Sequence, residues 1–123
     1  MPDFSFVLLY VSDPLKSAAF YADILGKPIV ESAPTFAMLP LNGTVMLGLW
    51  RRDDVTPKPT GRDSANEVAF TVADADTVRA THADWSRRGL PIVQVPTDLD
   101  FGCTFVAQDP DGHRLRVFAP QAQ

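Results

Sequence analysis

The same succession of segments occurs twice in this chain of 123 residues, and this repeat constrains the fold more than any other feature. The residues Phe6–Asp13 (FVLLYVSD) align with Glu67–Asp74 (EVAFTVAD). Each is followed by a helical pattern that ends in Gly-x-Pro, at Gly26–Pro28 and Gly89–Pro91. Each then leads to a hairpin with an x-Gly turn. An ordered repeat of this kind predicts two similar modules whose open sheets need to be covered.

The first half of the chain alternates strand and helix signals. Strands are predicted over Phe4–Val11, Pro28–Glu31, Thr35–Leu41 and Thr44–Trp50. Asp13 and Pro14 combine an N-cap with proline at the first helical position, so a helix is predicted from there to Gly26. Asn42-Gly43 is a strong signal for a tight hairpin between the last two strands.

The second half repeats this order after a polar segment. Strands are predicted over Glu67–Val72, Ile92–Val95, Cys103–Gln108 and His113–Phe118, with a helix from Asp74 to Gly89 and a turn at Asp109–Gly112. The residues Arg51–Asn66 contain two prolines and a glycine, which predicts a surface linker. We therefore expect an α+β fold of two tandem βαβββ modules that form open curved sheets around a cleft. This single domain spans 1–123, with module 1 at about 4–50, the linker at about 51–65 and module 2 at about 66–118.

Charge and cysteine content limit the possible partners and compartment. A net charge of −4 and a pI near 4.9 argue against a nucleic-acid or anionic membrane surface. Cys103 is the single cysteine, so an intrachain disulfide is excluded and a cytoplasmic location is expected. The apolar run Phe4–Val11 lacks a cationic flank and is too short to span a bilayer, so it is interpreted as a buried strand.

Several segments resemble a known group of proteins. The opening strand with VSDPLKSAAFYADILG, the hairpin and the closing DPDGHRLRVF resemble the vicinal oxygen chelate superfamily, which includes glyoxalases, bleomycin-resistance proteins and extradiol dioxygenases. Within it, LLYVSD, GLW, TDLDFGCTF and DPDGHRLRV are similar to phenazine-resistance proteins, which sequester a drug as homodimers. The resemblance implies a homodimer that binds a planar aromatic small molecule.

The resemblance also implies four metal-ligand positions, on the first and fourth strand of each module. The first-strand positions hold Phe6 and Glu67. With the two hairpin turns aligned on Gly43 and Gly112, the fourth-strand positions hold Leu47 and Arg116. Only Glu67 has a donor suited to a divalent ion. We therefore expect neither a metal nor another cofactor, and an ion pair between Glu67 and Arg116 in its place.

Strand alternation suggests which side chains line the cleft. It places Phe6, Leu8 and Tyr10 on one face of the first strand and Val7, Leu9 and Val11 on the helix side. Leu47, Leu49 and Phe105 are also expected on the cleft surface. The candidate ligand-binding residues are Phe6, Tyr10, Phe36, Leu47, Trp50, Glu67, Phe101, Cys103, His113 and Arg116. Arg116 is suited to a ligand carboxylate.

Two candidate residues also have a structural explanation. Cys103 has no histidine placed to activate it, which favours a buried, inert thiol. His113 follows the Asp-Gly turn, which favours a structural role at the start of a strand over a ligand contact. No catalytic residue is assigned.

Three functions are compatible with these features. The first is metal-independent sequestration of a planar aromatic molecule, as in antibiotic resistance. The second is a lyase, an isomerase or a dioxygenase-like enzyme, in which Glu67 could act as a general base. The third is a structural or regulatory dimer with a vestigial cleft.

Overall fold

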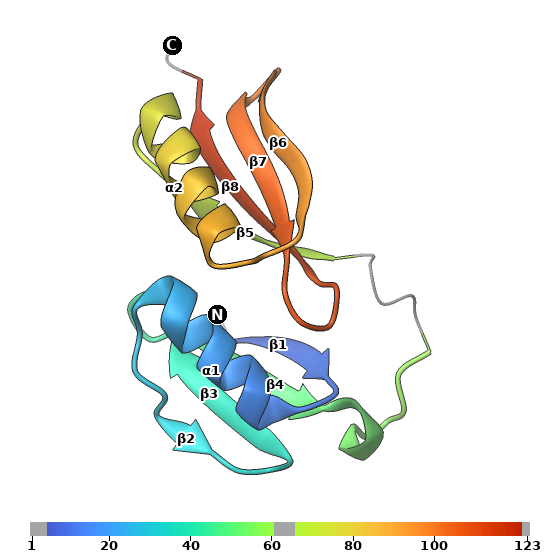
Figure 1. Cartoon of the computed structure of the whole chain (residues 1–123). Helices are drawn as coiled ribbons and strands as arrows, with labels where there is room; N and C mark the ends of the chain where they lie inside the picture. Colours follow the sequence, from blue (N-terminus) through green and yellow to red (C-terminus); the bar gives the residue numbers. More distant parts are fainter. Residues whose placement is uncertain (1–4, 61–65, 122–123) are drawn as a thin grey trace. The chain divides into compact units, whose positions relative to one another are not determined.

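Each half of the chain folds into a four-stranded mixed sheet with one helix against one face (Figure 1). The computed structural model describes residues 5–60 and 66–121, which form two compact units divided between residues 60 and 61. Unit 1 contains β1 (Phe6–Val11), α1 (Pro14–Leu25), β2 (Glu31–Ser32), β3 (Phe36–Pro40), β4 (Met46–Arg51) and the 3-10 turn η1 (Arg52–Asp54). Unit 2 contains β5 (Glu67–Thr71), α2 (Ala75–Arg87), β6 (Ile92–Leu99), β7 (Gly102–Gln108) and β8 (Arg114–Pro120).

The two sheets have the same topology. Their strand orders are β1-β4-β3-β2 and β5-β8-β7-β6, and the first strand of each unit lies parallel to the last. The remaining neighbours are antiparallel. This arrangement confirms the predicted α+β fold of two βαβββ modules.

Both helices begin where the sequence predicts. The Asp13 side chain accepts hydrogen bonds from the backbone N–H groups of Leu15 (3.1 Å) and Lys16 (3.2 Å), and Pro14 occupies the first turn. Helix α1 ends at Gly26, whose positive φ of 63° favours glycine. In α2, Asp74 accepts hydrogen bonds from the Thr77 backbone N–H (2.8 Å) and hydroxyl (2.6 Å). These two bonds hold the pKa of Asp74 below its usual value.

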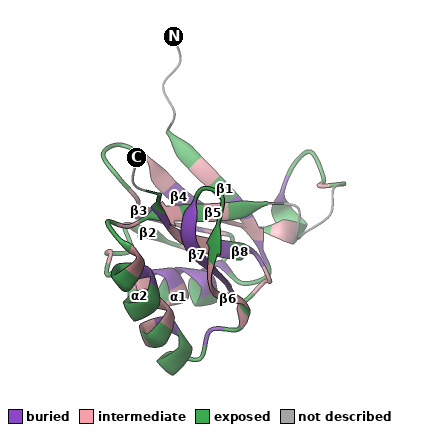
Figure 2. Cartoon of the chain, turned by 90° about the horizontal axis from the view of Figure 1, so that it is seen from above, coloured by how far each residue is buried: buried purple, intermediate pink, exposed green. Residues whose placement is uncertain are grey.

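Each unit has its own apolar core between helix and sheet. In unit 1, Tyr21 of α1 is fully buried with the helix-facing side chains of the sheet, which are Leu9, Val11, Ala37, Leu39, Leu47 and Leu49. In unit 2, the Trp85 ring of α2 packs edge-on against Phe70 (6.2 Å between centroids) and Phe105 (5.5 Å). Strand β7 is buried from Gly102 to Ala107, whereas α2 exposes much of its outer surface (Figure 2). The His82 ring of α2 also meets the Phe105 ring edge-on, with 5.4 Å between the ring centroids.

The expected positions of Leu47, Leu49 and Phe105 on the cleft surface are wrong. These three side chains are buried in the cores, on the helix-facing side of their strands. In unit 1, Leu47 pairs with Val7 of β1 and Leu39 of β3, which places all three side chains on one face. The opposite face of β4 carries Met46, Gly48 and Trp50.

For Leu47 and Leu49, the error comes from aligning the two hairpin turns on their glycines, Gly43 and Gly112. The turns close equivalently, because Leu41 N–H bonds to the Val45 carbonyl (2.8 Å) as Asp109 N–H bonds to that of His113 (3.0 Å). Glycine is the third residue of the first turn and the fourth of the second. Matching Gly43 to Gly112 therefore slips the register by one residue, which moves a side chain to the other face.

Other element bounds differ modestly from the prediction. Strand β2 is limited to Glu31–Ser32, although the preceding Val30 N–H still bonds to the Met38 carbonyl (2.9 Å). Strand β6 continues through Pro96 to Leu99, with register shifts on the way. The predicted start at Phe4 and linker residues 61–65 lie outside the described residues. Among residues 5–60 and 66–121, neither helix has the length and apolar character needed to cross a membrane.

The Asp74 cap leads to a prediction about pH. Asp74→Ala should lower the melting temperature at pH 7, because two hydrogen bonds at the start of α2 are lost. Since folding lowers the Asp74 pKa, its contribution is full above the unfolded-state pKa and is lost as pH falls through the folded-state value. The difference between wild type and variant, followed by thermal unfolding, should therefore shrink in acid. Asp74→Asn keeps an acceptor without a charge, and should show little of this pH dependence.

Candidate functional site

The face of the unit 1 sheet that is turned away from α1 is apolar. Cross-strand pairing puts Phe6 beside Met46, Leu8 beside Gly48 and Tyr10 beside Trp50 on this open face. Four of its side chains border a shallow, open hollow of about 360 Å³, here called the apolar hollow, lined by Phe6, Leu8, Phe36 and Trp50. Three strands therefore supply three aromatic rings and one aliphatic side chain to one concave surface.

The walls of the apolar hollow remain open to solvent. Phe6 and Leu8 are 43% and 44% exposed, although both are large apolar side chains. The Tyr10 ring meets that of Trp50 edge-on, with 6.4 Å between centroids, and so supports one wall without lining the hollow itself. A contiguous exposed apolar surface of this kind is typical of a binding site.

The open face of unit 2 carries charge instead. Arg116 Nε donates a hydrogen bond to Glu67 Oε1 at 2.7 Å, and Arg116 NH2 lies 3.5 Å from Glu67 Oε2. The Arg116 side chain is 19% exposed and that of Glu67 is 35% exposed. The predicted ion pair is therefore confirmed, in a partly buried setting where the partners offset each other's desolvation.

Two polar side chains and two rings complete the surroundings of this pair. Arg116 NH1 donates to the Thr104 hydroxyl oxygen at 3.1 Å and lies 3.5 Å from Gln94 Oε1. We call Glu67, Gln94, Thr104 and Arg116 the Arg116 network. The guanidinium carbon also lies 5.8 Å from the centre of the Phe101 ring, which meets Phe118 edge-on at 5.8 Å. A ligand carboxylate at Arg116 would have to compete with Glu67.

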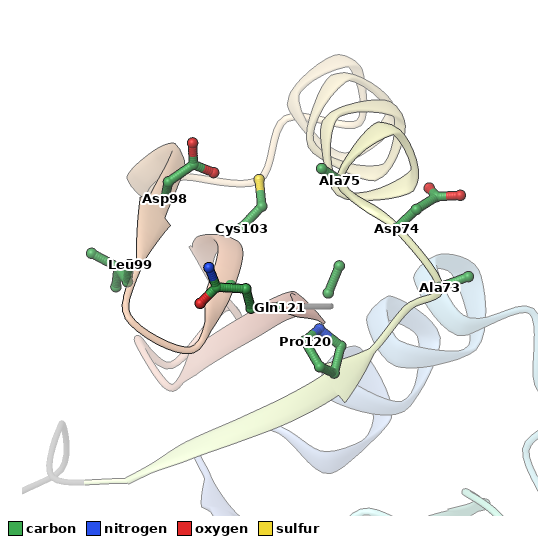
Figure 3. Close-up of a pocket in the computed structure, with 10 residues that line it drawn as sticks. Ala73, Asp74, Ala75, Asp98, Leu99, Cys103, Pro120 and Gln121 are labelled. Carbon is green, nitrogen blue, oxygen red and sulfur yellow. The ribbon is translucent and has the colours of Figure 1, made fainter. Parts of the chain in front are cut away.

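Cys103 belongs to a different part of unit 2. It lines a hollow of about 490 Å³ beside the start of α2, together with Ala73, Asp74, Ala75, Asp98, Leu99, Gly102, Ala119, Pro120 and Gln121 (Figure 3). In Figure 3 its sulfur lies between Asp98 and Ala75. Cys103 pairs with Ala119 on the helix-facing side of the sheet, whereas Arg116 occupies the open face. The two candidate residues Cys103 and Arg116 therefore lie on opposite faces of the sheet, and Cys103 is buried, as the structural explanation predicts.

His113 lies at the end of the second hairpin turn. Its backbone N–H donates to Asp109 Oδ1 at 2.8 Å, and the same oxygen accepts from the Asp111 N–H at 2.9 Å. Both Asp109 and His113 are buried, and neither lines the apolar hollow or the hollow around Cys103. The arrangement supports the structural interpretation of His113, because it fixes the turn that precedes β8.

The site residues do not fit a divalent metal. The corrected register places Gly48 where Leu47 was expected, because Gly48 pairs with Leu8 as Arg116 pairs with Ala69. Neither Phe6 nor Gly48 has a side-chain donor, and in unit 2 Glu67 stands beside the permanent cation of Arg116. Within residues 5–60 and 66–121, no group of three or more His, Cys, Asp or Glu side chains is arranged to hold an ion.

Sequence reasoning missed four residues of these two surfaces. Strand alternation places Leu8 on the open face with Phe6, but the set of candidate ligand-binding residues does not include it. Gly48 was hidden by the one-residue slip between the turns. Thr104 and Gln94 reach Arg116 through the pairing of β6, β7 and β8, and the register shifts in β6 leave no simple sequence signal for this.

Comparisons with known proteins agree with the fold. The model of the glyoxalase/bleomycin resistance protein/dioxygenase superfamily matches residues 4–117, and the chain belongs to this superfamily. The chain is 27% identical over 113 residues to the phenazine antibiotic resistance protein EhpR of Enterobacter agglomerans, covering 89% of this chain and 86% of EhpR. The predicted resemblance is thereby confirmed.

Solved structures extend the comparison. A protein of Agrobacterium tumefaciens, solved by NMR in solution, is 42% identical with a TM-score of 0.89, and the match covers 99% of this chain and 100% of that one. A glyoxalase-related enzyme from Fulvimarina pelagi has a TM-score of 0.82 at 21% identity, with coverage of 97% and 88%. At that identity the second likeness shows the shared fold alone.

The Arg116 network leads to a prediction about stability. Glu67→Ala should lower the free energy of unfolding by about 1–2 kcal/mol, because it leaves a largely covered guanidinium without its carboxylate partner. The double variant Glu67→Ala/Arg116→Met should be more stable than Glu67→Ala, since the unpaired cation is removed. Urea-induced unfolding measures both differences.

The Asp76–Arg79 pair provides a matched control. Its side chains are 92% and 58% exposed, so Arg79→Ala should leave the unfolding midpoint almost unchanged. A Glu67→Ala variant as stable as Arg79→Ala would show that the Glu67–Arg116 pair makes no net contribution.

Proposed function

We propose that this protein binds and sequesters a planar aromatic small molecule without a metal, as a protein of the antibiotic-resistance type. The observation that carries the proposal is the apolar hollow, where Phe6, Phe36 and Trp50 present three rings around one solvent-accessible space. Homology to EhpR, a phenazine antibiotic resistance protein by name, supports the same conclusion.

The dimensions and chemistry of the apolar hollow suit such a ligand. Its volume of about 360 Å³ lies at the lower end of the range of roughly 300–1,000 Å³ found for small-molecule sites. Each offset or edge-on ring contact contributes about 0.5–1.5 kcal/mol beyond the burial of apolar area. Several such contacts support micromolar binding, which corresponds to about −8 kcal/mol.

The Arg116 network bears on the charge of the ligand. The Arg116 guanidinium is already bonded to Glu67, and Thr104 and Gln94 engage its NH1 group. A carboxylate at Arg116 would have to share this guanidinium with Glu67, which brings two anions close to one cation. Because the side chains that line the apolar hollow are also uncharged, we propose an uncharged aromatic molecule, in preference to the aromatic acid suggested by the sequence.

The same contacts weaken the enzymatic alternative. A general base needs a carboxylate oxygen that is free to accept a proton from the substrate. Both Glu67 oxygens instead face Arg116, at 2.7 Å and 3.5 Å. Sequestration is thus the function that these contacts favour.

Substitutions in the apolar hollow test the proposal. Phe36→Ala and Trp50→Ala should each weaken the binding of an uncharged planar aromatic by about tenfold or more, because a ring wall is removed. Trp50 fluorescence can report binding in wild type and in Phe36→Ala, since the other tryptophan, Trp85, is buried in the core of unit 2. Equilibrium dialysis is required for Trp50→Ala.

Leu47→Ala is the matched control, because Leu47 lies on the opposite face of the strand that carries Trp50. It should reduce the free energy of unfolding by about 2–5 kcal/mol and leave the affinity of the folded protein unchanged. If none of a panel of uncharged planar aromatics binds the wild-type protein, the proposal fails and the open face has another role.

A further inference from the structure

Gly48 lies beneath two of the side chains that line the apolar hollow, Leu8 and Phe36. A Cβ atom placed on Gly48 would lie 2.5 Å from Leu8 Cδ2 and 3.1 Å from Phe36 Cζ. Real Cβ atoms essentially never come as close to another heavy atom as the distance to Leu8, and few come as close as the distance to Phe36. Leu8 and Phe36 therefore occupy the space that any other residue at this position would fill.

The backbone does not explain why this residue is glycine. Gly48 lies inside β4, between the buried residues Leu47 and Leu49, and its φ is not positive. Glycine within a strand lowers stability, and it commonly marks a place where other groups approach the backbone closely. The close approach here is made by Leu8 and Phe36, so the absence of a side chain serves the shape of the open face.

The corresponding position in unit 2 carries a long side chain instead of none. Gly48 pairs with Leu8 and Met38, as Arg116 pairs with Ala69 and Val106. In unit 2 the long Arg116 side chain covers the sheet and reaches Glu67. In unit 1 the same place in the sheet carries no side chain of its own, and Leu8 and Phe36 of the apolar hollow lie over it.

We infer that Gly48 determines the size of the aromatic ligand, by letting Leu8 and Phe36 lie low enough for the apolar hollow to accept a fused ring system. The inference rests on the proposed function and specifies its ligand class: uncharged planar aromatics with two or more fused rings. A side chain at position 48 would lift Leu8 and Phe36 toward the ligand. The largest ring systems would lose most from this change.

The test is Gly48→Ala in the full-length chain, with two probes that are uncharged at pH 7.5: quinoline, with two fused rings, and phenazine, with three. Equilibrium dialysis measures both dissociation constants. Phenazine should bind about tenfold more weakly to the variant, whereas quinoline should lose less than about threefold, because overpacking removes space that only the larger probe needs. Thermal unfolding monitors the fold of each variant.

A second substitution separates loss of space from a backbone effect. If the added methyl acts by displacing Leu8, then Leu8→Ala should relieve the conflict. The phenazine dissociation constant of Gly48→Ala/Leu8→Ala should therefore lie within about threefold of that of Leu8→Ala alone. Such a result would mean that the effects of the two substitutions are not additive, as is usual for residues in contact. Should Gly48→Ala alone fail to fold, the comparison of the double variant with Leu8→Ala still decides the question.

The possible failures are distinguishable. The role of Gly48 would be overturned if Gly48→Ala weakened the binding of quinoline and phenazine equally, or changed neither affinity. It would also be overturned if the double variant bound phenazine tenfold more weakly than Leu8→Ala does. In each case aromatic binding itself would stand. A wild-type protein that binds neither probe would overturn the proposed function, and the inference about Gly48 with it.

Discussion

The arrangement of both units depends on one constraint: alternate side chains of a strand point to opposite faces, and each helix covers only one of them. The covered face has to be apolar, and in unit 1 it is filled by residues such as Leu39, Leu47 and Leu49. The other face is then free to take a composition that the core does not dictate. The two units use this freedom differently, with an apolar hollow in unit 1 and the Arg116 network in unit 2.

The Glu67–Arg116 pair shows how a charged group is accommodated on such a face. An arginine that is only 19% exposed has lost most of its hydration, and the loss has to be offset by well-placed acceptors. Glu67 supplies the charge, while Thr104 and Gln94 supply neutral oxygens. These contacts satisfy Arg116 within the chain itself, so the guanidinium does not need a ligand to be stable. This is why we propose that aromatic recognition belongs to unit 1, where the apolar hollow is lined by uncharged side chains.

Local signals predicted most of the fold and part of the site. The caps at Asp13 and Asp74 located both helices, and alternation assigned the faces of β1, because these features depend only on neighbouring residues. The ion pair followed from the resemblance, which places Glu67 and Arg116 at two of the four metal-ligand positions. What failed depended on register: matching the turns on Gly43 and Gly112 placed Leu47 where Gly48 stands. The position of a glycine does not show which backbone N–H and carbonyl groups close a turn, so it does not fix the register of the strand that follows.

The separation of core and open face also explains how one superfamily can include both enzymes and binding proteins. The side chains that hold each helix to its sheet are not those that form the open face, so the latter can be exchanged without loss of the core. Here the position shared by Gly48 and Arg116 illustrates the point within a single chain. One unit omits the side chain and gains space for rings, whereas the other extends a guanidinium across the sheet. Neither open face offers a suitable set of metal donors among the described residues, so the proposed aromatic binding would draw its affinity from ring contacts and from the shape that Gly48 permits.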